Sequence, residues 1–165
     1  MKNSHRAVSS DTWFLDVAIC REFEGLWPRL AVCVDNAGRL INAELLEDPA
    51  DLAHFLDVTI YKYGRTTAPS LIVVDRGLRR YLTSYEAAGL LAAGASFPIG
   101  AGKAERWLRS LTHALSSRMP HHLTEARDII VSIVNDCNTP TSPRAGCTPI
   151  PQAGVSTPDP AGGPS

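Results

Sequence analysis

The stretch from Leu71 to Asp75 places the tightest limit on how this chain can fold. Leu71-Ile72-Val73-Val74 is a short apolar run with β-branched residues at its centre, bounded by Pro69 and Gly77. Such a run predicts a buried strand. Asp75 follows directly, so the strand carries a carboxylate at its C-terminal end, and Gly77 lets the chain turn there. The remaining sequence must supply a sheet for this strand.

A second acidic residue lies in a helical pattern further along. Apolar residues recur at spacings of three and four, which predicts a helix with one apolar face. They are Ala104, Trp107, Leu108, Leu111 and Leu115. Glu105 is expected in the first turn of this helix. An acid at a strand end and an acid at the start of a helix can meet across a shallow site.

Three strand candidates precede the Leu71 run. They are Trp13–Cys20, Leu30–Asp35 and Arg39–Leu46. A turn with Gly25 and Pro28 joins the first two, and Asn36-Ala37-Gly38 is a tight hairpin signal between the second and third. Short turns between successive strands predict an antiparallel meander.

The helices complete an α/β pattern. Asp48 as N-cap and Pro49 in the first turn predict a helix that ends at Gly64, and this crossover makes the Leu71 strand parallel to part of the meander. Ser84 is predicted to cap a helix over Tyr85–Ala93, which a brief strand and a flexible loop follow before the Glu105 helix. The predicted strand is Ala95–Phe97, the loop is Pro98–Gly102, and a last helix runs from a Thr124 cap to Val134. The order predicts a mixed sheet with helices packed on it.

Composition indicates one globular domain with appendages. The chain has 165 residues and is 44% hydrophobic, which is enough to fill a core. We expect a flexible N-terminus (1–10), a core (11–118), a C-terminal helical extension (119–138) and a disordered Pro/Gly-rich tail (139–165). No apolar run approaches ~18 residues and no secretory signal is evident, so a cytoplasmic protein with no membrane span is expected. Cys20 and Cys33 lie in apolar runs and no C-x-x-C pair exists, which favours buried, reduced thiols over a zinc site.

Charge is balanced overall but not locally. The formal net charge is −1, whereas Asp75 to Arg118 contains seven basic and three acidic residues. The basic residues there include Arg76, Arg79, Arg80, Lys103, Arg106 and Arg109. Charge alone favours a solvated helix face for them over a nucleic-acid site.

Asp16 is a third acid of interest, because it lies inside the first predicted strand. Singly, each acid has a structural explanation: an outward strand position for Asp16, a turn for Asp75 and the helix dipole for Glu105. Together, three oxygen ligands from separate elements suit Mg²⁺ or Mn²⁺. Two such ions roughly 3.5–4 Å apart would clamp the attacking and leaving oxygens of a phosphodiester displacement.

Four motifs in series resemble one family. Trp13-Phe14-Leu15-Asp16 and then Leu30 to Arg39 are similar to the W-x-x-D … L-x-V-x-D-x-x-x-R opening of the integrase catalytic core, which retroviral integrases share with bacterial insertion-sequence transposases. Val74-Asp75-Arg76-Gly77 is similar to the second motif, and Lys103 to Leu111 to the third. Val134 to Pro140 and Gly146 to Pro149 resemble the Y-N-x-x-P … G-x-T-P segment that follows the core in bacterial transposases.

This resemblance implies an RNase H-like mixed sheet, three antiparallel strands plus parallel strands, flanked by helices. It implies DDE-type polynucleotidyl transfer: metal-dependent DNA strand cleavage and strand transfer in integration or transposition. Asp16, Asp75 and Glu105 would be the catalytic acids and hold two Mg²⁺ (or Mn²⁺) ions, with DNA as partner and a homo-oligomer as the assembly. The six basic residues from Arg76 to Arg109 would contact DNA phosphates. Asp35 would have a structural role, pairing with Arg39.

Departures from the family pattern leave alternatives open. The family often has a Thr two positions after its first acid; Asp16 lacks it, and Asp11-Thr12 offers Asp11 as an alternative first ligand. Arg76 replaces the usual Asn, and the interval from Asp75 to Glu105 is shorter than is familiar. The chain shows no DNA-recognition domain or C-terminal barrel, which suggests a fragment of a larger transposase from a bacterial mobile element. A catalytically decayed DNA-binding or assembly remnant and an RNase H-like nuclease remain alternatives.

Overall fold

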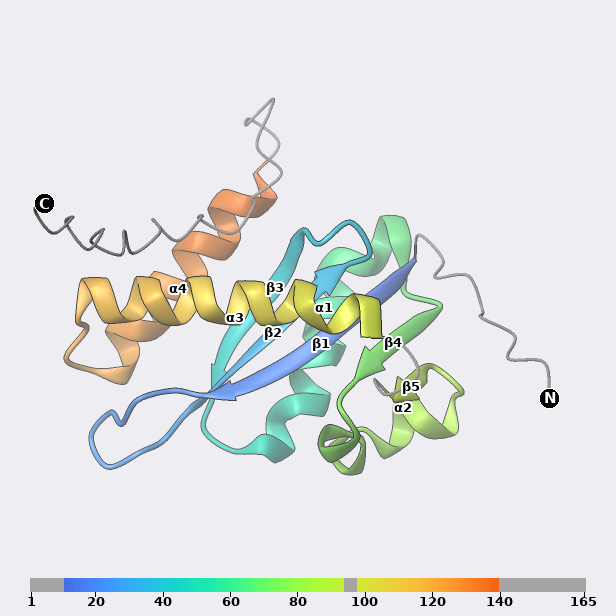
Figure 1. Cartoon of the computed structure of the whole chain (residues 1–165), viewed down its shortest axis with the longest axis horizontal. Helices are drawn as coiled ribbons and strands as arrows, with labels where there is room; N and C mark the ends of the chain where they lie inside the picture. The colour runs from blue at the N-terminus through green and yellow to red at the C-terminus, as the bar shows by residue number, and fades with distance from the viewer. Residues whose placement is uncertain (1–10, 94–97, 140–165) are drawn as a thin grey trace, which may run out of the picture.

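A five-stranded sheet flanked by helices on both faces forms the core of the chain (Figure 1). The computed structural model describes residues 11–93 and 98–139; the predicted flexible N-terminus and nearly all of the Pro/Gly-rich tail lie outside these ranges. Strands β1 (Thr12–Ile19), β2 (Arg29–Asp35) and β3 (Leu40–Leu46) pair antiparallel. The predicted meander is therefore confirmed.

The crossover to the parallel part of the sheet also follows the prediction. Asp48 caps a 3₁₀ turn, η1 (Pro49–Asp51), by accepting a hydrogen bond from the Ala50 amide at 2.8 Å. Helix α1 (Leu52–Thr67) leads to β4 (Leu71–Val74), which pairs parallel to β1. The predicted end of α1 at Gly64 is wrong: the helix continues through the glycine and stops before Pro69, because a residue that precedes proline disfavours helical geometry.

The segment after β4 differs from the prediction. A 3₁₀ helix, η2 (Arg76–Tyr81), precedes a short α2 (Thr83–Ala87), and Gly89 ends that helix with a φ of +71°. Strand β5 (Leu91–Ala93) then pairs parallel to β4 and forms the edge of the sheet. The predicted helix over Tyr85–Ala93 is thus wrong in its second half, because the open edge of β4 offers the chain backbone partners. The predicted strand Ala95–Phe97 lies outside the described residues.

The last two helices are both longer than predicted. Helix α3 (Pro98–Arg118) begins at Pro98, where the sequence predicted a loop, and proline is favourable in a first helical turn. Helix α4 (Leu123–Asn138) begins one residue before its predicted cap at Thr124 and passes the predicted end at Val134. The Glu125 carboxylate closes its N-terminus by accepting from the His121 amide at 2.8 Å. The Asn138 side chain secures its C-terminus by donating to the Ile41 carbonyl at 3.0 Å.

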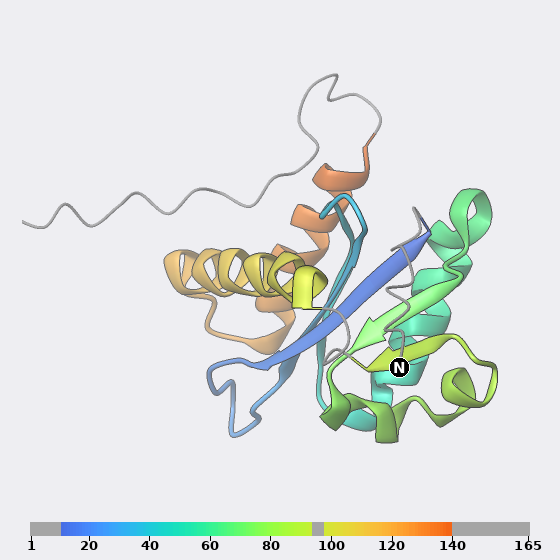
Figure 2. The ribbon, with the colours of Figure 1, turned by 45° about the vertical axis from the view of Figure 1, so that its right-hand side comes forward.

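Two hydrophobic cores lie on the two faces of the sheet (Figure 2). Helices α3 and α4 cover one face and α1 covers the other. Phe14 belongs to the core under α3, and its neighbour Leu15 belongs to the core under α1, as the alternation of a strand requires. Trp107 is 4% exposed and belongs to the α3 core, as predicted. None of the described helices has the length and apolar character needed to span a membrane.

Candidate active site

Asp16, within β1, and Asp75, directly after β4, lie at the same level on two neighbouring parallel strands. The β1–β4 register pairs Leu15 with Val74, and each aspartate is the next residue along its chain. Val73, like Phe14, lies in the core beneath α3, so alternation places both aspartates on the α3 side of the sheet. Hydrogen-bonded strands lie about 4.8 Å apart, so the two backbones hold these carboxylates close together.

The Asp16 carboxylate is half-buried, and its environment opposes ionisation. Burial is the largest cause of a raised pKa at Asp16, and the charges of Asp75 and Glu105 raise that pKa further. The Val17 amide, which donates to Asp16 Oδ1 at 2.8 Å, acts in the opposite direction. The three predicted acids are therefore near enough to interact electrostatically.

Asp75 is exposed and acts as the N-cap of η2. Its Oδ1 accepts a hydrogen bond from the Gly77 amide at 2.7 Å. A Cβ at position 77 would come within 3.1 Å of that oxygen, so glycine suits this close approach. No described residue bonds to the other carboxylate oxygen, Oδ2, which leaves it available to a ligand.

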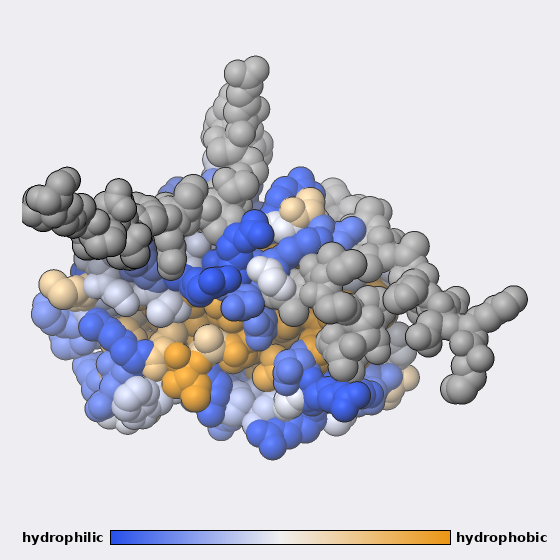
Figure 3. Space-filling model, viewed as in Figure 1, coloured by the Kyte–Doolittle hydropathy of each residue, from blue (hydrophilic) through white to orange (hydrophobic). Residues whose placement is uncertain are grey.

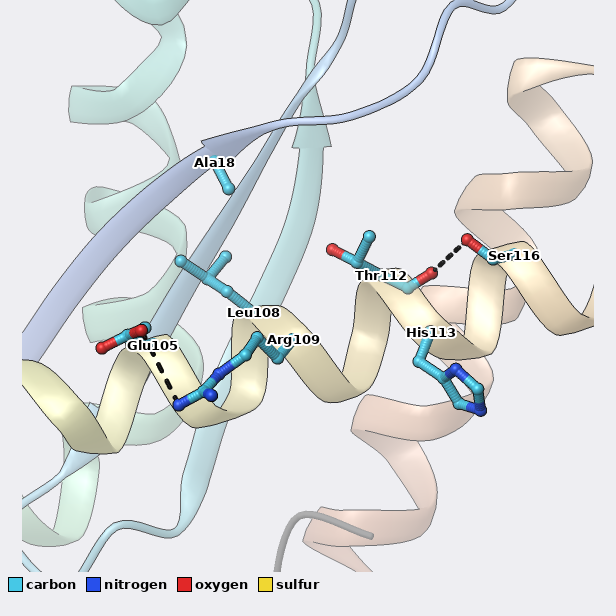
Figure 4. A pocket seen from close by; sticks show the side chains of 7 residues that line it. All are labelled: Ala18, Glu105, Leu108, Arg109, Thr112, His113 and Ser116. Carbon is cyan, nitrogen blue, oxygen red and sulfur yellow. Dashed lines mark hydrogen bonds and ion pairs between the residues drawn. The ribbon is translucent and has the colours of Figure 1, made fainter. Parts of the chain in front are cut away.

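Glu105 reaches the site from α3. The predicted position in the first helical turn is wrong: α3 begins at Pro98, so Glu105 lies about two turns inside the helix. Its side chain is exposed, and Oε1 lies 3.7 Å from an Arg109 nitrogen (Figure 4). The packing of α3 against β1 therefore sets the position of Glu105.

A groove beside Glu105 contains residues that the sequence did not single out. It has a volume of about 390 Å³ and runs between α3 and the end of β1 (Figure 4). Its residues are Ala18, Glu105, Leu108, Arg109, Thr112, His113 and Ser116. The helical spacing from Glu105 through Arg109 and Thr112 to Ser116 was the available signal. Figure 3 shows apolar surface in a band beside α3, with hydrophilic side chains along the helix itself.

The carboxylates of Asp16, Asp75 and Glu105 have the chemistry of a magnesium site, although they do not form a tight cluster. All three acids supply carboxylate oxygens from separate elements on one face, which suits Mg²⁺. Within residues 11–93 and 98–139, however, no three His, Cys, Asp or Glu side chains are clustered tightly enough to hold a metal ion. The two-ion site remains a prediction.

Asp11, the alternative first ligand, lies at the opposite end of β1. Its carbonyl accepts from the Ser70 amide at 3.1 Å, just before β4 begins, and the adjacent pair in the register is Thr12 with Leu71. Five residues at about 3.3 Å each separate it from Asp16, roughly 16 Å along the strand. Its position is therefore remote from Asp75 and Glu105.

The six predicted DNA contacts fall into two groups. Arg76, Arg80 and Arg106 are exposed and form no ion pair with any residue that the structure describes; Arg80 contacts its neighbour Tyr81, donating to the hydroxyl at 2.7 Å and lying 4.8 Å from the ring centre. The other three bind a residue on another element or an acidic side chain: Arg79 pairs with Glu86, Arg109 with Glu105, and Lys103 with Asn36. The first group is free to meet a ligand without breaking an ion pair.

Two structural expectations are confirmed. Arg39 Nε lies 2.6 Å from Asp35 Oδ2, and the Arg39 amide donates to Asp35 Oδ1 at 2.9 Å, so Asp35 closes the β2–β3 turn. Cys20 and Cys33 are buried free thiols. Burial raises the pKa of both.

Comparison with known proteins decides the fold. No protein family model matches the sequence, and no curated protein matches it. Among solved structures, the BIV integrase catalytic core domain aligns with a TM-score of 0.57 at 17% identity, over 83% of this chain and 87% of that one. This chain has the fold of a retroviral integrase catalytic core. The predicted RNase H-like mixed sheet is thus confirmed.

Two further structures give the same integrase-core fold. The HTLV-2 integrase catalytic core, solved in complex with magnesium in a trimeric form, aligns with a TM-score of 0.56 at 15% identity over 80% of this chain and 87% of that one. A simian T-cell lymphotropic virus intasome in complex with the PP2A regulatory subunit B56 gamma aligns with a TM-score of 0.57 at 18% identity, over 96% of this chain and 60% of that one. The integrase-core fold is therefore shared despite low identity.

Proposed function

We propose that this chain is the catalytic core of a DNA transposase or integrase that cleaves and joins DNA strands with divalent metal ions. The observation that carries the proposal is the β1–β4 register. It brings Asp16 and Asp75 side by side on the face where α3 presents Glu105. Asp16, not the remote Asp11, is then the first acid.

The three carboxylates would hold two Mg²⁺ ions, in keeping with the magnesium named for the HTLV-2 core. Bound Mg²⁺ supplies Lewis-acid activation of the scissile phosphodiester and of the attacking hydroxyl. Asp16 contributes a carboxylate that burial has already made costly to ionise, so a nearby cation relieves that cost. Asp75 offers Oδ2 while Gly77 holds Oδ1.

DNA is the proposed partner of the same face. Arg76, Arg80 and Arg106 are exposed, Arg76 directly follows Asp75 and Arg106 directly follows Glu105, and all three suit sequence-independent phosphate contacts. We further propose a homo-oligomer, because the HTLV-2 cores were solved as a trimer and a dimer. The tail motifs that resemble insertion-sequence transposases support a bacterial mobile element as the source and the cytoplasm as the site of action.

One observation favours a second candidate, a DNA-binding or assembly module that keeps the fold and has lost the chemistry. The three acids do not form a preassembled metal cluster among the described residues. Asp75 caps η2 and Glu105 pairs with Arg109, so both have structural partners. Metal binding separates the two candidates.

A Mg²⁺ titration followed by calorimetry tests the proposal. We expect binding that is lost in Asp75→Asn and Glu105→Gln and is unchanged in Glu44→Gln. Glu44 is a control because it is the exposed residue of β3 and alternates with Ala43 and Leu45 of the α3 core, which puts it on the opposite face from the acids. Absence of Mg²⁺ binding by the wild type, or binding that survives both substitutions, would favour the inactive module. A labelled donor DNA end then distinguishes strand transfer from the plain nicking expected of an RNase H-like nuclease.

A further inference from the structure

Lys103 has an unusual set of contacts for a predicted phosphate ligand. Its ammonium donates to the Asn36 carbonyl and lies 3.3 Å from Asn36 Oδ1, so two oxygens of one residue already solvate the charge. The ammonium also lies 5.3 Å from the centre of the Phe14 ring, within the range of a cation–π contact. Lys103 is therefore directed toward the β2–β3 turn and is partly buried there.

Trp107, one helical turn later, contacts the same turn. Its indole N–H donates to the Gly38 carbonyl at 2.9 Å, and the ring is buried in the α3 core. Two side chains of α3 thus bind carbonyls two residues apart, those of Asn36 and Gly38, in one short loop. The contacts are separated by four residues, about 6 Å along the helix axis.

The β2–β3 turn is itself well fixed. The Gly38 amide donates to the Asp35 carbonyl at 2.9 Å, and the Asp35 amide donates to the Arg39 carbonyl at 3.0 Å. The Asp35–Arg39 ion pair closes the loop, and Gly38 adopts a φ of +83° that suits glycine. The turn is therefore a firm point of attachment for α3.

Glu105 lies midway between these two attachments along the helix. A contact on either side fixes both the height and the rotation of α3 at that point. We propose that Lys103 and Trp107 are positioning residues that anchor α3 to the β2–β3 turn and so hold Glu105 toward Asp16 and Asp75. Lys103 is accordingly not a DNA contact. The role assigned to Glu105 rests on the proposed function, whereas the anchor itself does not.

Arg106 provides the matched control. It lies on the same helix, is exposed, and has no recorded partner among the described residues. A phosphate contact by Arg106 breaks nothing, whereas a phosphate contact by Lys103 requires the loss of its Asn36 hydrogen bonds. The two cations, three residues apart, therefore have opposite predicted effects.

Three measurements on Lys103→Met, Lys103→Arg and Arg106→Met test the proposal. The Trp107 indole N–H should exchange with solvent faster in Lys103→Met than in the wild type, with recovery in Lys103→Arg and no change in Arg106→Met. The Mg²⁺ dissociation constant should rise roughly tenfold in Lys103→Met alone, as for other residues that orient metal ligands. The slope of the logarithm of the DNA-binding constant against the logarithm of salt concentration should be unchanged in Lys103→Met. The magnitude of this slope should fall by ~0.9 in Arg106→Met.

The buried Trp13 indole serves as the folding reference for each variant. A Lys103→Met protein with unchanged Trp107 exchange, or with the reduced salt slope expected of Arg106→Met, would overturn the anchor role. Altered exchange with an unchanged Mg²⁺ affinity would overturn the positioning of Glu105. A wild type that binds no Mg²⁺ would contradict the proposed function and the positioning role together, while the indole exchange would still decide the anchor.

Discussion

Asp16 and Asp75 each stand one residue beyond the Leu15–Val74 pair, at the point where parallel pairing of β1 and β4 ends. Two carboxylates on one face of adjacent strands repel one another, and half-burial of Asp16 adds a desolvation cost. This arrangement of the two carboxylates is unfavourable in the metal-free protein. It becomes favourable when a divalent cation neutralises the pair.

Asp16→Asn should stabilise the metal-free protein at neutral pH. The folded-state pKa of Asp16 is raised above its ordinary value of 3.8, so the folded state binds more protons and stability falls as pH rises from below that value through the raised pKa. Asparagine lacks this cost and keeps an acceptor for the Val17 amide. Urea unfolding across acidic to neutral pH should show an advantage for Asp16→Asn that vanishes below the ordinary pKa. An equal advantage at every pH would contradict this account.

Gly38→Ala should destabilise the fold by about 1 kcal/mol or more, because alanine is strained at a φ of +83°. Gly102→Ala is its matched control. Gly102 lies in α3 with open space around the position of a Cβ, so alanine there should stabilise by up to about 1 kcal/mol through its higher helix propensity. Chemical denaturation measures both. Equal effects of the two substitutions would show that backbone conformation does not govern the β2–β3 turn.

Ile130→Ala in α4 should cost about 2–5 kcal/mol, because the residue is 1% exposed in the core beneath α3 and α4. Its neighbour Val131 is 53% exposed, and Val131→Ala should change stability by no more than about 0.5 kcal/mol. Thermal or urea unfolding of the pair tests whether α4 belongs to the cooperative unit. A small effect of Ile130→Ala would mean that α4 folds and detaches separately.

Local patterns predicted the elements that depend on near neighbours. The β1–β2–β3 meander, the Asp48 cap and the Leu71 strand each follow from turn signals and apolar periodicity within a few residues. The boundary between α2 and β5 did not follow, because Leu91–Ala93 is a plausible helix end until the free edge of β4 is present to pair with it. Competition between a helix and a sheet edge is settled by tertiary contacts.

The candidate site shows the same division between what local sequence patterns predict and what tertiary contacts decide. The sequence indicated Asp16, Asp75 and Glu105, but it left Asp11 as an alternative first ligand because Asp16 lacks the Thr that often follows the first acid of the family. The register of β1 against β4 separates the two positions. Lys103 and Arg106 are both basic residues on one helix, and only the packed structure directs Lys103 into the β2–β3 turn.

The sequence by itself determined which residues carry charge, which runs are apolar and where the chain can turn, since these are properties of short segments. The tertiary structure alone decided which acids share a face, which cations are already neutralised and how far α3 extends. Those outcomes depend on strand register and helix docking, which arise from contacts between residues distant in the chain.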